Sequence, residues 1–157
     1  MSIHAIHSLV QESPEQVREV LAMYDRRRKK TLRIDCSADV VTHVSKKVRT
    51  SLQEYFLVIC LDNQNTPLKT LEIHKGGCDA VVIDARCVFR AALAVKGCTR
   101  IVLVHNHPTG DLTPSPQDRA VTTKLVKGGD LLGLTVLDHV ILSGEDSLSM
   151  RDLGMIG

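Results

Sequence analysis

Aromatic residues are scarce in this sequence, which contains no tryptophan, two tyrosines and two phenylalanines. Proteins that bind single-stranded nucleic acid without sequence preference stack the bases on aromatic side chains, so this class is disfavoured. An excess of charge is also lacking, because 20 lysines and arginines against 18 acidic residues leave a formal net charge of +2. Such a small charge does not by itself indicate a nucleic-acid-binding protein. We therefore expect weak or no DNA binding by this chain alone.

Long apolar runs and paired cysteines are missing as well. No apolar stretch approaches the roughly 18 residues that a membrane-spanning helix requires, and the N-terminus lacks the apolar region of a signal peptide. The five cysteines form no Cys-x-x-Cys pair and are odd in number, so neither a disulfide framework nor a cysteine zinc site is indicated. We expect a cytoplasmic protein without a membrane partner, whose cysteines are small core residues in a reducing compartment: Cys36, Cys60, Cys78, Cys87 and Cys98.

What is present is an alternation of helical and strand patterns over 157 residues, 43% of which are apolar. Cap residues and apolar spacing predict helices over 13–28, 39–52, 84–97 and 115–129. Apolar runs bounded by turn residues predict strands over 55–61, 68–74, 101–104 and 136–142, with a further short segment at 131–134. This order predicts an α/β fold, in which a mixed central sheet is covered by helices on both faces.

Candidate metal ligands follow the third predicted strand. Residues two apart in a strand project to the same face, so His105 and His107 present both imidazoles to one point while Asn106 faces away. A proline and several turn residues then take the chain out of the sheet, and it returns at Ser115. Asp118 lies in the first turn of the next helix, where it faces back toward the loop. Catalytic zinc sites typically combine three such protein ligands with an open position.

The spacing of the whole segment is more specific than a pair of histidines. It runs His-x-His-Pro, six residues, Ser, two residues, Asp, which is the JAMM motif. The stretch from His105 to Asp111, with Leu137-Asp138-His139 downstream and residues 61–64 upstream, resembles the bacterial RadC-like JAMM domains. The resemblance covers roughly residues 51–154.

This resemblance implies a JAB/MPN-like fold, related to the layered fold of cytidine deaminases, over 51–157, with an N-terminal helical segment over 1–50 that packs on the core or precedes it. It implies a metallopeptidase or isopeptidase that acts on a peptide or protein substrate. One Zn²⁺ per chain would be held by His105, His107 and Asp118. In the family a glutamate on an earlier strand activates the zinc-bound water, whose pKa the metal lowers to about 7.

Two glutamates precede the motif. The family places its glutamate at the start of the strand after the first long helix, which matches Glu54. Glu72 is the alternative, although it could equally be an exposed partner of Lys69 or His74. Ser115 is expected to cap the helix, and in the family the matching serine also helps to stabilise the oxyanion.

Several features fit two interpretations. Asp138 and His139 either support a ligand imidazole or are hydrogen-bonded parts of a core strand. The five cations at 26–30 fit a solvated helix end or a phosphate-contacting patch.

Two other functions compete with hydrolysis. One is a DNA-repair or mobile-element accessory protein, although the helix-hairpin-helix region of longer RadC-like proteins is not found before residue 51. The other is a scaffold that keeps the metal without turnover. Nucleobase deamination is excluded because the chain has neither His-x-Glu nor Pro-Cys-x-x-Cys.

Overall fold

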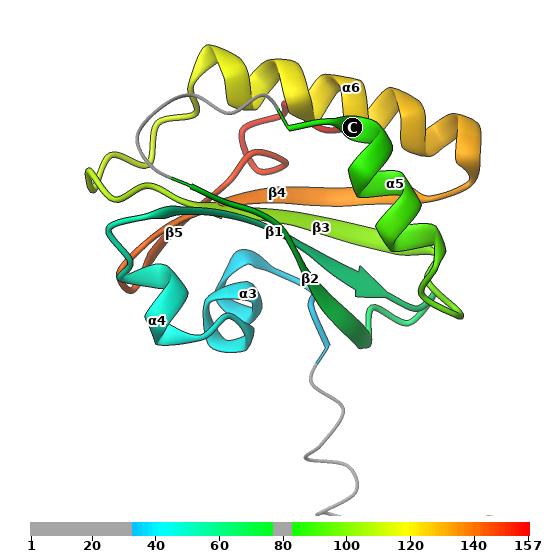
Figure 1. The fold of residues 1–157 in the computed structure, drawn as a ribbon, viewed down its shortest axis with the longest axis horizontal. Coiled ribbons are helices and arrows are strands. Elements are labelled where there is room, and N and C mark those ends of the chain that lie inside the picture. Colours follow the sequence, from blue (N-terminus) through cyan, green and yellow to red (C-terminus); the bar gives the residue numbers. More distant parts are fainter. Residues whose placement is uncertain (1–32, 77–82) are drawn as a thin grey trace, which may run out of the picture. The chain divides into compact units, whose positions relative to one another are not determined.

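The computed structural model describes residues 33–76 and 83–157 of the chain. Within these ranges, five strands form one mixed sheet with helices on both of its faces, as the sequence predicts (Figure 1). The predicted helix over 13–28, the cation run at 26–30 and Cys78 lie outside the described residues.

The sheet has the strand order β2-β1-β3-β4-β5. Strand β1 is antiparallel to β2 and β3, β3 is parallel to β4, and β4 is antiparallel to β5. Parallel neighbours need a long crossover, and a helix, α6, connects β3 to β4. The strands are β1 (Glu54–Leu61), β2 (Pro67–Gly76), β3 (Arg100–Asn106), β4 (Thr135–Ser143) and β5 (Asp146–Ser149). The helices are α3 (Ser37–His43), α4 (Lys46–Arg49), α5 (Ala85–Leu93) and α6 (Pro116–Leu132).

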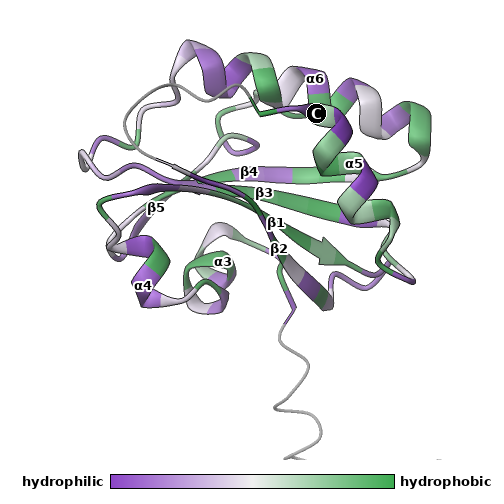
Figure 2. Ribbon diagram, in the orientation of Figure 1, coloured by the Kyte–Doolittle hydropathy of each residue, from purple (hydrophilic) through white to green (hydrophobic). Residues whose placement is uncertain are grey.

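Two hydrophobic cores lie on opposite sides of the sheet. Helices α5 and α6 cover one side, called here the α5–α6 face, and α3 and α4 cover the other, the α3–α4 face (Figure 1). Because side chains alternate along a strand, β3 contributes Ile101 and Leu103 to the first core and Val102 and Val104 to the second. Figure 2 shows β3 as largely hydrophobic, whereas α6 carries both hydrophobic and hydrophilic residues.

The predicted helix over 39–52 is in fact two short helices, α3 and α4. The backbone of Val44 is extended (φ −78°, ψ 131°) and separates the two helices, and Ser45 is the N-cap of α4. Val40 and Val44 are both buried against the sheet, and Val48 packs beside them. The bend therefore allows the valines of both segments to reach one sheet face, which overrides the helical spacing that predicted a continuous helix.

Helix α6 does not end at its paired glycines as predicted, but continues to Leu132. A Cβ atom on Gly128 would lie 2.7 Å from the ring of Phe89, and one on Gly129 would lie 2.3 Å from the carbonyl oxygen of Leu134. The two glycines therefore allow the Phe89 ring and the Leu134 backbone to pack closely against the helix. The helix ends at Gly133, whose left-handed backbone (φ 68°) is typical of a C-cap. Residues 131–134 are the helix end and a turn rather than a separate element.

The other predicted elements are present, with boundaries that differ by a few residues. Helix α5 is capped by Asp84, as predicted, and ends at Leu93 rather than near residue 97. The short strand β5 was not predicted. Cys60 is buried as expected, but the prediction is wrong for Cys36, which is exposed. Over the described ranges, none of the helices is long and apolar enough to cross a membrane.

Candidate metal centre

The candidate site lies where β3 ends and α6 begins. His105 is the penultimate residue of β3, His107 follows the strand, and Asp118 lies in the first turn of α6. Because β1 runs antiparallel to β3, the N-terminal end of β1 lies beside this same end of β3, and Phe56 pairs with His105. The hydrogen bond from the His107 N–H to the Leu142 carbonyl extends the pairing with β4. The sheet thus fixes the backbone of both histidines.

The structure brings the three predicted ligands together. The Nε2 atoms of His105 and His107 lie 2.7 Å apart. The Asp118 carboxylate lies 3.3 Å from Nε2 of His105 and 3.6 Å from Nε2 of His107. One donor atom from each residue falls within 4.8 Å of the others, so the group could hold a metal ion. The side chains are mostly buried, with exposed fractions of 7% for His105 and 15% for the other two.

Each imidazole is also held by its other ring nitrogen. Nδ1 of His107 donates to the backbone carbonyl of Asp111. Nδ1 of His105 lies 2.9 Å from Nε2 of His139. In both rings the Nδ1 atom is occupied and the Nε2 atom faces the other donors. This arrangement, with a fixed ring and one nitrogen directed at a common point, is typical of metal-ligating histidines.

Hydrogen bonds at the start of α6 hold the Asp118 carboxylate in place. The Ser115 N–H donates to Oδ2 of Asp118 over 2.7 Å, and the Asp118 N–H donates to Oγ of Ser115 over 3.1 Å. This capping box satisfies two backbone donors of the helix end. Burial by itself raises the pKa of Asp118, but the neighbouring rings of His105 and His107 and the hydrogen bond from Ser115 outweigh burial and hold the pKa well below its usual range. The side chain is therefore a carboxylate at neutral pH.

The chemistry of this donor set fits zinc. Two imidazole nitrogens and one carboxylate match the number and type of protein ligands in catalytic zinc sites. The nearby Asp118 carboxylate raises the pKa of His107, against the effect of burial, and the Asp111 carbonyl and the charge of Glu54 raise it further. A protonated His107 must release its second ring proton before it can act as a ligand.

The two candidate glutamates lie on different faces of the sheet. Glu54 begins β1, two residues before Phe56, which belongs to the core of the α5–α6 face. It is exposed, and its charge contributes to the raised pKa of His107. Glu72 pairs with Leu57, which belongs to the core of the α3–α4 face. Since directly paired residues share a face, Glu72 lies on the side of the sheet away from the imidazoles.

Asn106, between the two histidines, ties β3 to the chain around Glu54. Its Oδ1 atom accepts the Tyr55 N–H over 2.8 Å. Its Nδ2 atom donates to the carbonyls of Ser51 at 3.3 Å and Gln53 at 3.1 Å. The side chain is completely buried. Asn106 faces away from the ligands, as predicted, but this contact with the start of β1 was not foreseen.

The neighbours Asp138 and His139 have different roles. His139 is fully buried and contacts the ligand His105, and its Nδ1 atom lies 2.6 Å from Oγ1 of Thr122. Burial lowers its pKa, and the nearby His105 lowers it further, so His139 is neutral. Asp138 accepts hydrogen bonds from the His139 N–H at 2.7 Å, from Ser149 Oγ at 2.6 Å and from the Arg151 N–H at 3.0 Å. His139 therefore contacts a candidate ligand imidazole, whereas the Asp138 carboxylate is hydrogen-bonded to groups outside the candidate ligand set.

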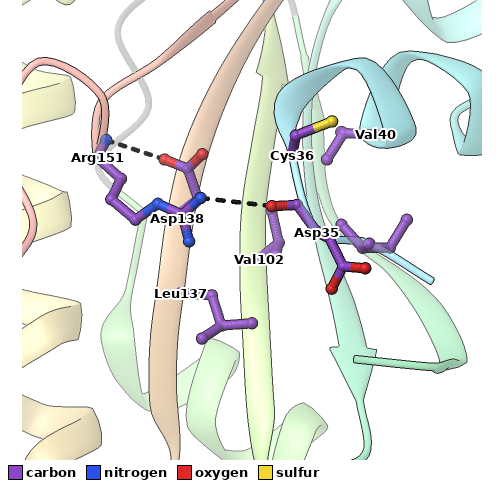
Figure 3. A pocket seen from close by; sticks show the side chains of 8 residues that line it. Asp35, Cys36, Val40, Val102, Leu137, Asp138 and Arg151 are labelled. Carbon is purple, nitrogen blue, oxygen red and sulfur yellow. Dashed lines mark hydrogen bonds between the residues drawn. The ribbon is translucent and has the colours of Figure 1, made fainter. Parts of the chain in front are cut away.

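Asp138 lines a pocket on the α3–α4 face of the sheet (Figure 3). Arg151 spans it, since its backbone N–H donates to Asp138 and its side-chain Nη2 donates to the Asp35 carbonyl at 3.4 Å. Cys36 and Val102 contribute to the lining. None of the three candidate ligands lines this pocket, so it is distinct from the candidate metal centre.

Sequence reasoning missed two contributors to the site. Thr122 follows Asp118 by four residues and therefore lies on the same side of α6, a spacing that could have identified it. Asp111 contributes its backbone carbonyl rather than its side chain, so residue type gave no indication of its role.

Comparisons with known proteins agree with this geometry. The family described as RadC-like JAB domain matches residues 34–155. A UPF0758 protein of Geotalea uraniireducens (strain Rf4) is 40% identical over 139 residues, which are 88% of this chain and 60% of that protein. A UPF0758 protein of Methanosarcina barkeri is 39% identical over 118 residues, 75% of this chain and 51% of that protein. One of Finegoldia magna is 47% identical over 98 residues, 62% of this chain and 44% of that protein. The chain spans at most 60% of the length of these relatives.

Proposed function

Because this chain belongs to the RadC-like JAB domain family, we propose that it is a zinc-dependent hydrolase of peptide or isopeptide bonds. The observation that carries the proposal is the convergence of His105, His107 and Asp118 at the end of β3, with the carboxylate of Glu54 on the same face of the sheet. Metal binding alone would need only the three ligands. Hydrolysis also needs a general base, and a nearby carboxylate outside the ligand set can serve as one.

In the proposed mechanism, His105, His107 and Asp118 would hold one zinc ion. When bound, the ion would supply Lewis-acid chemistry, which can lower the pKa of a water to about 7. The capping box with Ser115 keeps the Asp118 carboxylate oriented before any metal arrives. The Asp111 carbonyl does the same for the ring of His107. The chain thus supplies donors that need little rearrangement.

Glu54 is the proposed general base. It accepts the proton of the attacking water and passes it to the leaving amine, which is the usual work of a carboxylate in this position. Its place at the start of β1 supports this role, because the pairing of β1 with β3 and the hydrogen bond between Tyr55 and Asn106 fix the backbone there. Its exposure leaves the carboxylate open to water and substrate.

Ser115 is the proposed oxyanion donor. Its Oγ atom accepts the Asp118 N–H in the capping box. A hydroxyl that accepts one hydrogen bond can still donate another, so the Ser115 O–H group can donate a hydrogen bond to a carbonyl oxygen that gains negative charge. The two roles of Ser115 are compatible.

The proposal is tested by separating metal binding from catalysis. A peptide-library screen with the zinc-loaded protein first identifies a substrate. We then expect Glu54→Gln to keep one zinc per chain, because Glu54 is not a ligand, and to lose hydrolysis by a factor of about 100 to 10,000. Zinc content is measured by elemental analysis and activity by single-turnover cleavage.

Glu72→Gln is the matched control, since it makes the same chemical change on the opposite face of the sheet. It should retain both zinc and activity. If the Glu72 variant loses cleavage while the Glu54 variant keeps it, the assignment of the base is wrong. If the parent protein binds zinc but cleaves nothing in the library, the scaffold function is favoured instead.

A further inference from the structure

A continuous path of hydrogen bonds leads from one ligand into the core and returns to another. His105 Nδ1 lies 2.9 Å from His139 Nε2, and His139 Nδ1 lies 2.6 Å from Thr122 Oγ1. Oγ1 of Thr122 in turn donates to the backbone carbonyl of Asp118 over 2.5 Å. His139 and Thr122 are 0% and 1% exposed. The path therefore joins His105 to Asp118 without passing through their metal-facing atoms.

The chemistry of its two ends determines the direction of the path. A carbonyl oxygen only accepts, so the hydroxyl hydrogen of Thr122 points at Asp118. Oγ1 of Thr122 then accepts from Nδ1–H of His139. A neutral imidazole carries one N–H, so Nε2 of His139 is left as an acceptor. The proton between the two rings must then be on Nδ1 of His105. In the neutral ring, Nε2 of His105 then keeps its lone pair, and this atom faces the other two donors.

The opposite direction is disfavoured by the surroundings of His139. If His139 donated to His105, it would carry protons on both nitrogens and be a cation. It is fully buried and packs edge-on against Phe56, with ring centroids 5.6 Å apart. No carboxylate contacts its ring among the described residues, because Asp138 accepts only from its backbone N–H. An unpaired cation in such a place is costly.

We propose that His139 and Thr122 are positioning residues that fix His105 as the Nδ1–H tautomer, with Nε2 ready to bind the metal. The inference rests on the proposed metal site and adds two residues to it. The Asp111 carbonyl likewise accepts a hydrogen bond from Nδ1 of His107. In both ligand rings Nδ1 is therefore hydrogen-bonded and Nε2 is directed at the site. The path through Thr122 also couples the ring of His105 to the helix turn that carries Asp118.

The first test needs neither metal nor substrate. Long-range ¹H–¹⁵N spectra of the histidine rings in the metal-free full chain report which nitrogen carries the proton. We expect His105 to be protonated at Nδ1 and His139 to be neutral and protonated at Nδ1. In His139→Leu the acceptor is lost, so the proton of His105 should distribute between both nitrogens. An Nε2–H tautomer of His105 in the parent protein would overturn the inference, even if zinc binds tightly.

The second test measures zinc affinity by competition with a chelator. Thr122→Val removes the hydroxyl and keeps the shape, and it should weaken zinc binding by about 10- to 100-fold, as is typical for a residue that supports a ligand. Thr122→Ser keeps the hydroxyl, so its zinc affinity should stay within about 3-fold of that of the parent protein, a smaller change than the one expected for Thr122→Val. Equal losses in both variants would mean that Thr122 acts only through packing and would overturn the inference. His139→Gln, which can accept and donate at the same points, should bind more tightly than His139→Leu.

The outcomes separate this inference from the proposed function. A parent protein that shows the Nδ1–H tautomer of His105 but binds no zinc overturns the proposed function and leaves the hydrogen-bond path established. If the parent protein and the Thr122→Val and Thr122→Ser variants all bind zinc equally well, the proposed function stands and the positioning role is overturned. If Thr122→Val does not fold, the tautomer in the parent protein decides.

Discussion

Asp138 and His139 are adjacent in β4, yet they serve the two faces of the sheet in opposite ways. On the α3–α4 face, the Asp138 carboxylate is surrounded by three donors, and its hydrogen bonds end there. On the α5–α6 face, the His139 ring continues into a path that ends at two candidate metal ligands. A buried polar group that is fully satisfied contributes rigidity, whereas one that leads to open donor atoms prepares a site for a ligand.

This contrast shows why burial or polarity alone does not identify a functional residue. Both side chains are buried, at 5% exposed for Asp138 and 0% for His139, and both are hydrogen-bonded. They differ in where their partners lead. Substitutions on the α3–α4 face should therefore reduce stability, and substitutions on the α5–α6 face should reduce metal binding.

The largest effect is expected at the metal centre. His107→Ala should abolish stoichiometric zinc binding, because the site has three protein ligands and loses one of its two imidazoles. The matched control is His43→Ala on the α3–α4 face, where His43 contacts Thr70. It should keep a full equivalent of zinc. Elemental analysis of the purified variants checks this, and a full equivalent in the His107 variant would refute the ligand set.

The converse test is Asp138→Ala. The substitution leaves buried donors of His139, Ser149 and Arg151 without their acceptor, so the free energy of unfolding should fall by about 3 kcal/mol. Zinc affinity of the folded variant should stay within about 3-fold of the parent protein, below the 10-fold loss expected for a residue that supports a ligand. Urea unfolding and chelator competition measure the two quantities. Asp146→Ala, at an exposed residue of β5, should change neither. A large loss of zinc affinity in the Asp138 variant would break the distinction between the faces.

Asn106 lies on β3, the strand that carries His105, but its side chain is hydrogen-bonded to the start of β1. Asn106→Ala removes the three hydrogen bonds of a buried side chain and should lower the free energy of unfolding by about 2 kcal/mol. The Tyr55 amide should also exchange with solvent faster, as hydrogen-exchange NMR can measure. Gln53→Ala is the control, since only the backbone of Gln53 takes part. Unchanged exchange at Tyr55 would show that Asn106 is not what holds β1.

The smallest effect is expected at the start of α3. The pKa of Asp39 is lowered, chiefly because the Asp35 N–H donates to its carboxylate, with a further hydrogen bond from Cys36. A lowered pKa means that the charged group stabilises the fold above its unfolded-state pKa of about 3.9, and that this contribution is lost as the pH falls through the folded-state pKa. Asp39→Ala should therefore cost about 1 kcal/mol at pH 7. The difference from the parent protein should shrink below about pH 4, and urea unfolding at pH 7 and pH 3 tests this. A difference that is independent of pH would contradict the role of the charge.

Local pattern was sufficient to predict most of the fold. The apolar runs at 55–61 and 101–104 are the two central strands, β1 and β3, because strands buried on both faces are apolar throughout. The convergence of His105 and His107 follows from strand alternation, and the place of Asp118 follows from the cap at Ser115. These features depend on residues that are close in sequence.

The missed features depend on residues that are far apart in sequence. Gly128 stays inside α6 because the ring of Phe89 packs against it, and sequence alone does not place that ring there. Asn106 is linked to the start of β1 by contacts with residues about 50 positions away in the chain. The break at Val44 likewise reflects burial against the sheet, which overrides local helical preference.

The distribution of the site along the chain determines the order in which it assembles. All three candidate ligands lie between residues 105 and 118, whereas Glu54 lies beside this end of β3 only through the pairing of β1 with β3, and the hydrogen bond between its neighbour Tyr55 and Asn106 spans 51 residues. Short loops close at a lower entropic cost than long ones, so we expect the three ligands to come together earlier in folding than the proposed base. Under the proposed function, a chain whose β1 has not yet paired with β3 would bind metal without cleaving.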